Sequence, residues 1–242
     1  MIISHRYRYL FVELARTGST AISKELRLNY DGQKILRKHS TYLDFLRQAS
    51  EDEKSYFVFS GIRNPIDDAV SQYYKAKGDH HGRFSDGRAG DRMRDQYRFI
   101  DSTAADFTTY FRTFFRLPYA NWSILSHKDF NFVIRFENLA ADFDQALRLI
   151  GIEPVRPLPL VNKTEGRNVD YLSYYTPEII PYAKWVFGPY MKLWGYEFPK
   201  EWGEVSVSPL NQLTFDAANV VRRWYWSHVR QKPRRRAHIQ AV

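Results

Sequence analysis

Five consecutive residues near the start of the chain have the side chains needed to bind a phosphate group. Arg16-Thr17-Gly18-Ser19-Thr20 supplies a guanidinium, three hydroxyls and a glycine that tolerates a positive φ. Where such a loop opens a helix, the first backbone N–H groups are unpaired and the helix dipole favours an anion. The loop does not match the GxxxxGK[ST] pattern, and the chain has no GxGxxG. Taken alone, it is explained equally well as a turn with a helix cap.

A second segment, residues 63–73, also has a phosphate-binding pattern. Arg63 ends an apolar run, and Ser71 lies two helical turns further on. Ligands of open α/β sheets bind at the carboxyl ends of the strands, so Arg63 and Ser71 are candidates for holding one phosphate. The alternative is that Arg63 pairs with Asp67 or Asp68, and that Ser71 is a small packing residue.

Alternating strands and helices position both segments. The pattern predicts three strand–loop–helix units, with strands over 7–14, 56–62 and 130–136 and helices over 20–28, over 65–77 and up to Ile150. This order predicts a single α/β domain with a central parallel sheet flanked by helices. Further helices are expected over 104–117, from Thr176 as N-cap with Pro177 in the first turn, and over 210–229. Residues 78–98 predict a loop or a partly helical insertion.

With these segments in place, the sequence resembles the PAPS-dependent sulfotransferases over about residues 8–198. That family carries (K/R)-(S/T)-G-(S/T)-(S/T) after its first strand, as in residues 16–20. It also carries R-N-P-x-(D/E)-x-x-x-S-x-(Y/F), as in residues 63–73. Arg135-Phe136-Glu137-Asn138-Leu139 and Leu193-Trp194-Gly195-Tyr196 match two further family patterns. The resemblance implies a fold with the layout of the P-loop kinases.

The resemblance also implies a donor, PAPS, and the residues that hold it. Arg16, Thr17, Gly18, Ser19 and Thr20 would bind its 5′-phosphosulfate, and Arg63 and Ser71 its 3′-phosphate. Arg16 stands where most branches have lysine, so its role would be electrostatic, on the leaving phosphate. A late basic loop closes over the donor in this family, and by position this implicates Lys163, Thr164 and Arg167. The alternative for that loop is simple solvated charge.

Sulfuryl transfer to a hydroxyl requires a base for the acceptor proton, and His39 is the first candidate. Its segment, His39-Ser40-Thr41-Tyr42-Leu43-Asp44-Phe45, resembles that of the uronic acid 2-O-sulfotransferases, whose base is a histidine. Glu25 is the second candidate, because other glycan-modifying branches use a glutamate. The structural alternative for His39 is a surface residue beside Lys38 or a helix cap. The structural alternative for Glu25 is an exposed residue paired with the neighbouring Lys24 or Arg27.

Residues 78–98 contain further polar side chains. His80 and His81 with Asp79 and Asp86 fit no familiar metal spacing, so no metal site is expected and the segment is interpreted as an acceptor-binding lid. Its arginines would suit an acidic acceptor or be solvated charge; they are Arg83, Arg88, Arg92, Arg94 and Arg98.

Composition limits the remaining classes of protein. The 242 residues are 44% hydrophobic and contain no cysteine, which excludes disulfides, thiolate metal sites and a cysteine nucleophile. No apolar run near the start is long enough for a signal sequence or a membrane span, so a cytoplasmic protein is expected. The formal net charge is +9, and residues 217–242 hold seven basic residues and no acid.

In the last predicted helix, one stripe is formed by Leu213, Ala217, Val220 and Trp224, and arginines lie beside it. This pattern indicates a basic amphipathic helix, for which an anionic membrane surface or an anionic glycan is a suitable partner. No recognition motif supports nucleic acid. The other interpretation is a packed terminal helix followed by a disordered basic end.

The sequence therefore predicts a sulfotransferase domain over 1–205 and a basic helix and tail over 206–242. Its reaction would move a sulfuryl group from PAPS to a hydroxyl of a carbohydrate or glycolipid, or of a small molecule, without a metal. Two alternatives stay open: a nucleotide-dependent phosphoryl transferase of the kinase type, and a non-catalytic protein that binds anions or membranes.

Overall fold

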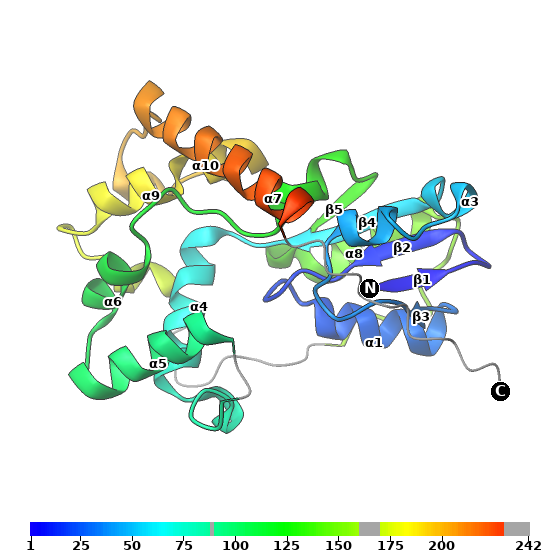
Figure 1. The fold of residues 1–242 in the computed structure, drawn as a ribbon, viewed down its shortest axis with the longest axis horizontal. Coiled ribbons are helices and arrows are strands. Elements are labelled where there is room, and N and C mark those ends of the chain that lie inside the picture. Colours follow the sequence, from blue (N-terminus) through cyan, green and yellow to red (C-terminus); the bar gives the residue numbers. More distant parts are fainter. Residues whose placement is uncertain (88–89, 160–169, 230–242) are drawn as a thin grey trace. The chain divides into compact units, whose positions relative to one another are not determined.

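The computed structural model describes residues 1–87, 90–159 and 170–229, and its fold is of the α/β class (Figure 1). Contacts divide the described residues into two compact units. The first comprises residues 1–63, 120–159 and 218–229, and the second comprises 64–87, 90–119 and 170–217. Whether the predicted division at residue 205 is functional stays a prediction. Within the described ranges, no helix has the length and apolar character needed to cross a membrane.

The first unit is built on one mixed sheet. Its strands are β1 (Ile2–Ser4), β2 (Tyr9–Val12), β3 (Gln33–Lys34), β4 (Phe57–Ile62) and β5 (Phe132–Arg135), in the order β3-β1-β2-β4-β5. The strands β2, β4 and β5 are parallel, as predicted, with Val12 opposite Ser60 and Ile62 opposite Arg135. β2 and β4 each lead toward a segment that the sequence assigns to a ligand.

The predicted central parallel sheet is thus present, but the whole sheet is mixed, because its β1 edge is antiparallel. The first expected strand, over 7–14, is in fact the second arm of a hairpin, because β1 and β2 pair antiparallel across a four-residue turn. Arg8 takes a positive φ of 54° in that turn. So short a connection can only return the chain antiparallel, since a parallel pairing requires a crossover of a dozen or more residues. β3 then adds to β1, also antiparallel.

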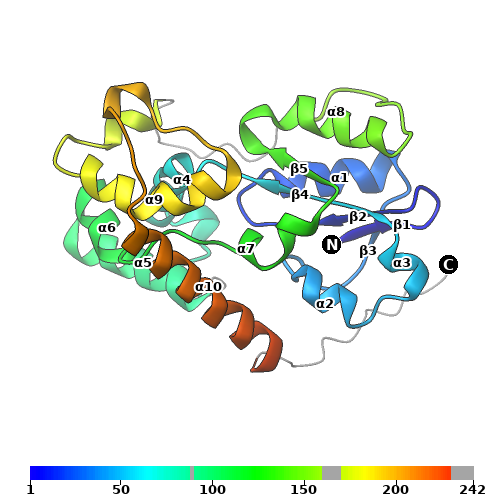
Figure 2. The same cartoon turned by 90° about the horizontal axis from the view of Figure 1, so that it is seen from above.

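Helices lie on both faces of the sheet (Figure 2), and alternation along the strands builds a core on each face. Phe11 and Phe59 point to one face, where α1 (Ser19–Asn29) and α8 (Leu139–Leu149) pack through residues such as Ile22 and Phe143. Leu10 and its neighbours point to the other face, toward α2 (Tyr42–Leu46). The remaining short elements of this unit are α3 (Glu51–Lys54), α7 (Ser123–Ser126), η2 (His127–Asp129) and η3 (Phe136–Asn138).

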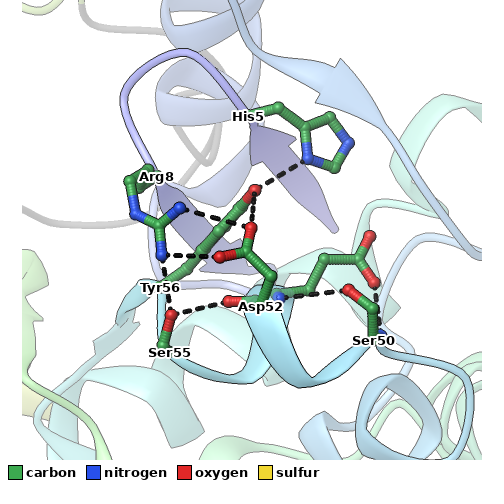
Figure 3. A network of polar contacts seen from close by, with 7 residues as sticks. His5, Arg8, Ser50, Asp52, Ser55 and Tyr56 are labelled. Carbon is green, nitrogen blue, oxygen red and sulfur yellow. Dashed lines mark hydrogen bonds and ion pairs between the residues drawn. The ribbon is translucent and has the colours of Figure 1, made fainter.

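A polar network ties the hairpin turn to α3 at the end of the sheet where β2 and β4 begin (Figure 3). Arg8 donates to both carboxylate oxygens of Asp52, at 3.2 and 2.9 Å, and its guanidinium lies over the ring of Tyr56. Tyr56 Oη also donates to Asp52 and is 3.0 Å from His5 Nδ1. The network lies at the opposite end of these strands from the loop at residues 15–18, so its role is to fix the hairpin.

The second unit is mainly helical. It contains α4 (Pro65–Lys77), η1 (His80–Gly82), α5 (Asp91–Thr103), α6 (Phe107–Phe114), η4 (Tyr171–Tyr174), α9 (Ile180–Trp194) and η5 (Lys200–Trp202). The start of α4 agrees with the prediction, because Asn64 caps the N–H of Ile66 and Pro65 occupies the first turn. The described part of this predicted segment, residues 78–87 and 90–98, is partly helical, since it contains η1 and the start of α5 at Asp91.

The helix predicted to begin with Thr176 as its N-cap begins later, at Ile180. The carbonyl of Thr176 accepts the N–H groups of both Ile179 and Ile180, so residues 176–179 form a turn before α9. The last helix, α10 (Pro209–His228), has nearly the predicted bounds and contributes residues to both units.

Candidate active site

The loop at residues 13–18 has the geometry of an anion-binding loop. It follows β2, and Arg16 and Gly18 both take left-handed backbone conformations, with φ of 67° and 72°. Glycine is favoured at position 18 by this positive φ, and a Cβ there would lie 2.6 Å from Leu139 Cδ2, so the Leu139 side chain would also have to shift. The chain then enters α1 at Ser19.

The N-terminus of α1 is suited to an anion. Gly18 provides no side-chain cap, and the first turn contains no acidic residue. The carbonyl of Gly18 accepts from Ala21 and Ile22, so the helical ladder begins at Ala21 and does not engage the N–H groups of Ser19 and Thr20. These N–H groups lie at the positive end of the helix dipole.

The three hydroxyls of the loop differ in what they contact. Thr17 Oγ1 donates to the carbonyl of Leu14 at 2.9 Å, and the residue is only 2% exposed. Its hydroxyl therefore stabilises the turn, and a contact of residue 17 with a ligand stays a prediction. Ser19 is buried, whereas Thr20 is exposed and accepts a hydrogen bond from Lys38.

Arg63 connects the two predicted phosphate-binding segments. It follows β4, is 6% exposed, and donates from Nη1 to the carbonyl oxygen of Arg16 at 3.3 Å. Its guanidinium also lies over the ring of Phe136, 4.2 Å from the ring centre, directly after β5. The residues that follow β2, β4 and β5 therefore meet at the carboxyl ends of the three parallel strands, where ligands of α/β sheets bind.

The other residues predicted to bind the donor's 3′-phosphate stay predictions. Ser71 is fully buried in α4 and belongs to the second unit. Asp68, one alternative partner of Arg63, accepts a hydrogen bond from Tyr119 Oη at 2.8 Å. Lys163, Thr164 and Arg167 lie outside the described residues.

His39 lies at the carboxyl end of β2, beside this loop. Its Nδ1 is 3.0 Å from the carbonyl oxygen of Glu13, the residue that follows β2. Because a carbonyl can only accept, Nδ1 carries the proton and Nε2 carries the lone pair. Burial lowers the pKa of His39 from its usual 6.5, and the nearby Lys38 lowers this pKa further. His39 is therefore neutral at pH 7 and held in the tautomer that a general base needs.

The segment after His39 has a structural explanation. The Thr41 hydroxyl accepts the N–H of Asp44, and the Asp44 carboxylate accepts the N–H of Thr41, which is a capping box for α2. Phe45 is a core residue. This leaves His39 as the side chain of the segment with a suitable geometry for chemistry.

Lys38 is a residue that the sequence analysis did not assign to the site. Its Nζ donates to Thr20 Oγ1 at 3.0 Å, which places an ammonium group in the first turn of α1. The sequence offered one signal for this assignment, the position of Lys38 next to His39. The contact itself joins Lys38 to Thr20, 18 positions away, and local sequence patterns do not reveal it. A cation there is suited to stabilise negative charge at the helix N-terminus.

Glu25 has the geometry of a structural residue. It is 1% exposed, and its two carboxylate oxygens accept from Nε and Nη2 of Arg156 at 2.9 and 2.8 Å. Asn29 donates to the same carboxylate. The hydrogen bonds from Arg156 lower the pKa of Glu25, which disfavours proton uptake. Its partner is thus Arg156, not the neighbouring Lys24 or Arg27.

A second histidine of the first unit, His127, has a different environment. It is buried against Phe130 with ring centres 4.7 Å apart, and burial lowers its pKa to about 3. It is therefore a neutral core residue and does not compete with His39 as a base.

Several polar side chains of residues 78–87 and 90–98 form hydrogen bonds or ion pairs within the second unit. Asp79 accepts from the N–H groups of Phe84 and Ser85 and so orders a turn. Arg92 donates to the carbonyl of Phe114, and Arg94 pairs with Asp91. In the part of the chain that the structure describes, no group of three or more His, Asp or Glu side chains could hold a metal ion. An acceptor-binding role for this segment stays a prediction.

Comparisons with protein-family models, curated proteins and solved structures found no match to this chain.

Proposed function

We propose that this protein is a sulfotransferase that moves a sulfuryl group from PAPS to a hydroxyl of a carbohydrate or glycolipid acceptor. The hydrogen bond from Arg63 to the carbonyl oxygen of Arg16 is the observation that carries the proposal. It joins two segments that the sequence assigns separately to the two phosphate ends of one nucleotide. A kinase-type loop would instead need the glycine-lysine pattern that this chain lacks.

The groups around the loop fit an anionic donor. The N–H groups of Ser19 and Thr20 would hold the phosphosulfate end, with Arg16 and Lys38 as nearby cations. Arg63, kept in position by Phe136, would contact the 3′-phosphate. The donor would supply an activated sulfuryl group, whose transfer leaves negative charge on a phosphate oxygen.

The side chains of the protein would then assist the transfer of the sulfuryl group in two ways, by accepting a proton and by stabilising negative charge. His39 Nε2 would accept the proton of the acceptor hydroxyl as the acceptor oxygen bonds to sulfur and the bond from sulfur to the phosphate oxygen breaks. Lys38 and Arg16 would stabilise the charge on that phosphate oxygen, and Lys38 could also donate a proton to it, which a guanidinium does not do. The products are a sulfate ester and adenosine 3′,5′-bisphosphate.

Transfer of label from ³⁵S-PAPS to a panel of saccharides, glycolipids and small hydroxyl compounds tests this proposal. The expected result is a labelled sulfate ester that forms with wild-type protein and that His39→Ala makes at least about 100-fold more slowly. A parallel series with γ-labelled ATP and Mg²⁺ covers the kinase alternative. Label transfer from ATP alone would overturn the proposal.

A further inference from the structure

The last helix, α10, is anchored by one side. Phe215 and Asn219 on that side are buried, and Trp226 packs edge-on against Trp122 with ring centres 5.7 Å apart. Asn211 lies on the same side and donates to the carbonyl of Trp185 at 2.8 Å. At 100° per residue, positions 211, 215, 219 and 226 share one side of a helix.

Arginine contacts fix the rotation of the helix near its C-terminus. Arg47 Nη2 donates to the carbonyls of Trp226 and Ser227, in the last turn of the helix, at 3.2 and 3.3 Å. Arg223 Nη2 donates to the carbonyl of Ile124 at 3.2 Å. The side of α10 that faces away from these contacts is therefore held toward solvent.

That opposite side is apolar, and we call it the outer face. It consists of Leu210, Leu213, Ala217, Val220, Val221 and Trp224. Leu213 and Val220 are each 65% exposed, and Trp224 is 57% exposed. With a rise of 1.5 Å per residue, the outer face forms a stripe about 21 Å long. A continuous exposed stripe of this kind marks an interaction surface, whereas single exposed apolar residues do not.

Charge selects the partner of the outer face. Residues 217–242 contain seven basic residues and no acid, and Asp216, the acid of α10, precedes this stretch. A polyanion such as a nucleic acid or an acidic glycan would satisfy the charge but leave the stripe uncovered. A second copy of the chain would cover the stripe but would bring two such basic segments together.

A lipid bilayer with anionic headgroups satisfies both requirements. Its acyl boundary accepts Leu, Val and Trp side chains, and its surface attracts Lys and Arg. Trp224 and Tyr225, both exposed, are side chains that favour the membrane–water boundary. We infer that the outer face of α10 docks on the surface of a bilayer that contains anionic lipids.

Vesicle flotation of the full chain tests this inference. Vesicles of phosphatidylcholine are compared with vesicles that also contain phosphatidylserine. The wild-type protein is expected to float only with the second kind, and less at high salt. The triple variant Leu213→Ser, Val220→Ser, Trp224→Ser should lose at least about tenfold of the bound fraction, because the outer face supplies the apolar contact.

The matched control is the triple variant Leu28→Ser, Leu149→Ser, Val155→Ser. It removes exposed apolar side chains of the first unit that lie outside α10, and it should float like the wild type. Equal flotation of the two triple variants, or no flotation of the wild type, would overturn the inference. A wild-type dimer that the outer-face variant dissociates, without flotation, would show that a second copy is the partner. Adenosine 3′,5′-bisphosphate binding should be the same in all three proteins, so this test is separate from the proposed function.

Discussion

Gly61 offers the sharpest perturbation of the loop, because it lies behind the loop and outside the ligand contacts. A Cβ at Gly61 would lie 2.8 Å from Thr17 Oγ1, 2.9 Å from Thr17 Cβ and 3.1 Å from the Thr17 carbonyl oxygen. Gly61 lies in β4 opposite Ile134 of β5, so the strand cannot easily retreat. The methyl group of Gly61→Ala must therefore push the loop outward.

The size of the displacement follows from these distances. Carbon atoms in good contact are about 3.5–4.0 Å apart, so the loop must move by about 0.6–1 Å. A misplacement of about 1 Å can cost about 100-fold in rate, and overpacking costs about 1–3 kcal/mol of stability. We expect Gly61→Ala to remain folded, with a lower melting temperature and at least about tenfold weaker binding of adenosine 3′,5′-bisphosphate.

Calorimetric titration with the bisphosphate, together with thermal unfolding, measures both effects. Gly90→Ala is the matched control, because a Cβ there meets no atom of the described residues within 4 Å. It should bind the bisphosphate like the wild type. If Gly61→Ala lost stability but bound the bisphosphate with wild-type affinity, the loop around Thr17 would not be part of the site.

Three further predictions concern ionisable residues of the first unit. His39→Ala should lower turnover at least about 100-fold with donor binding kept. In the wild type, burial lowers the pKa of His39, so kcat/KM should fall as the pH falls, with a midpoint below 6.5. A midpoint above 6.5 would refute the role of His39 as the base. Lys38→Ala should lower turnover about 100-fold, and Lys38→Met should lower it equally, because the positive charge of the ammonium group stabilises the leaving phosphate. Wild-type turnover in either variant would show that Lys38 is not part of the site. Glu25→Gln should keep turnover but lower the free energy of unfolding by about 1–3 kcal/mol. Because Arg156 lowers the pKa of Glu25, this stabilisation is present above pH 4.5 and is lost as the pH falls through the folded-state pKa, so unfolding curves of variant and wild type should converge in acid.

The elements nearest the site were predictable because their signals are local. Asn64 and Pro65 specify the start of α4, and Gly18 marks the start of α1. The apolar run before Arg63 predicted β4 correctly. The hairpin at residues 2–12 was missed, because its turn is rich in Tyr and Arg and lacks the glycine or asparagine of a typical tight turn.

Contacts between distant residues were not predictable from local patterns. Glu25 and Arg156 are 131 positions apart, so the sequence could only suggest neighbours of Glu25 on its own helix. The inward position of the Thr17 hydroxyl depends on Gly61 in the adjacent strand. The stripe in α10 was visible as a pattern, but periodicity alone cannot tell which of two apolar sides of a helix is buried.

The central claim is that residues 16–20 and Arg63 together form a site for a nucleotide with phosphates at both its 3′ and 5′ positions. Calorimetric titration of the full chain with adenosine 3′,5′-bisphosphate and with ATP tests this claim most directly. The account predicts that the bisphosphate binds more tightly than ATP, and that Arg63→Ala removes most of this preference. No binding of the bisphosphate, or tighter binding of ATP, would contradict it.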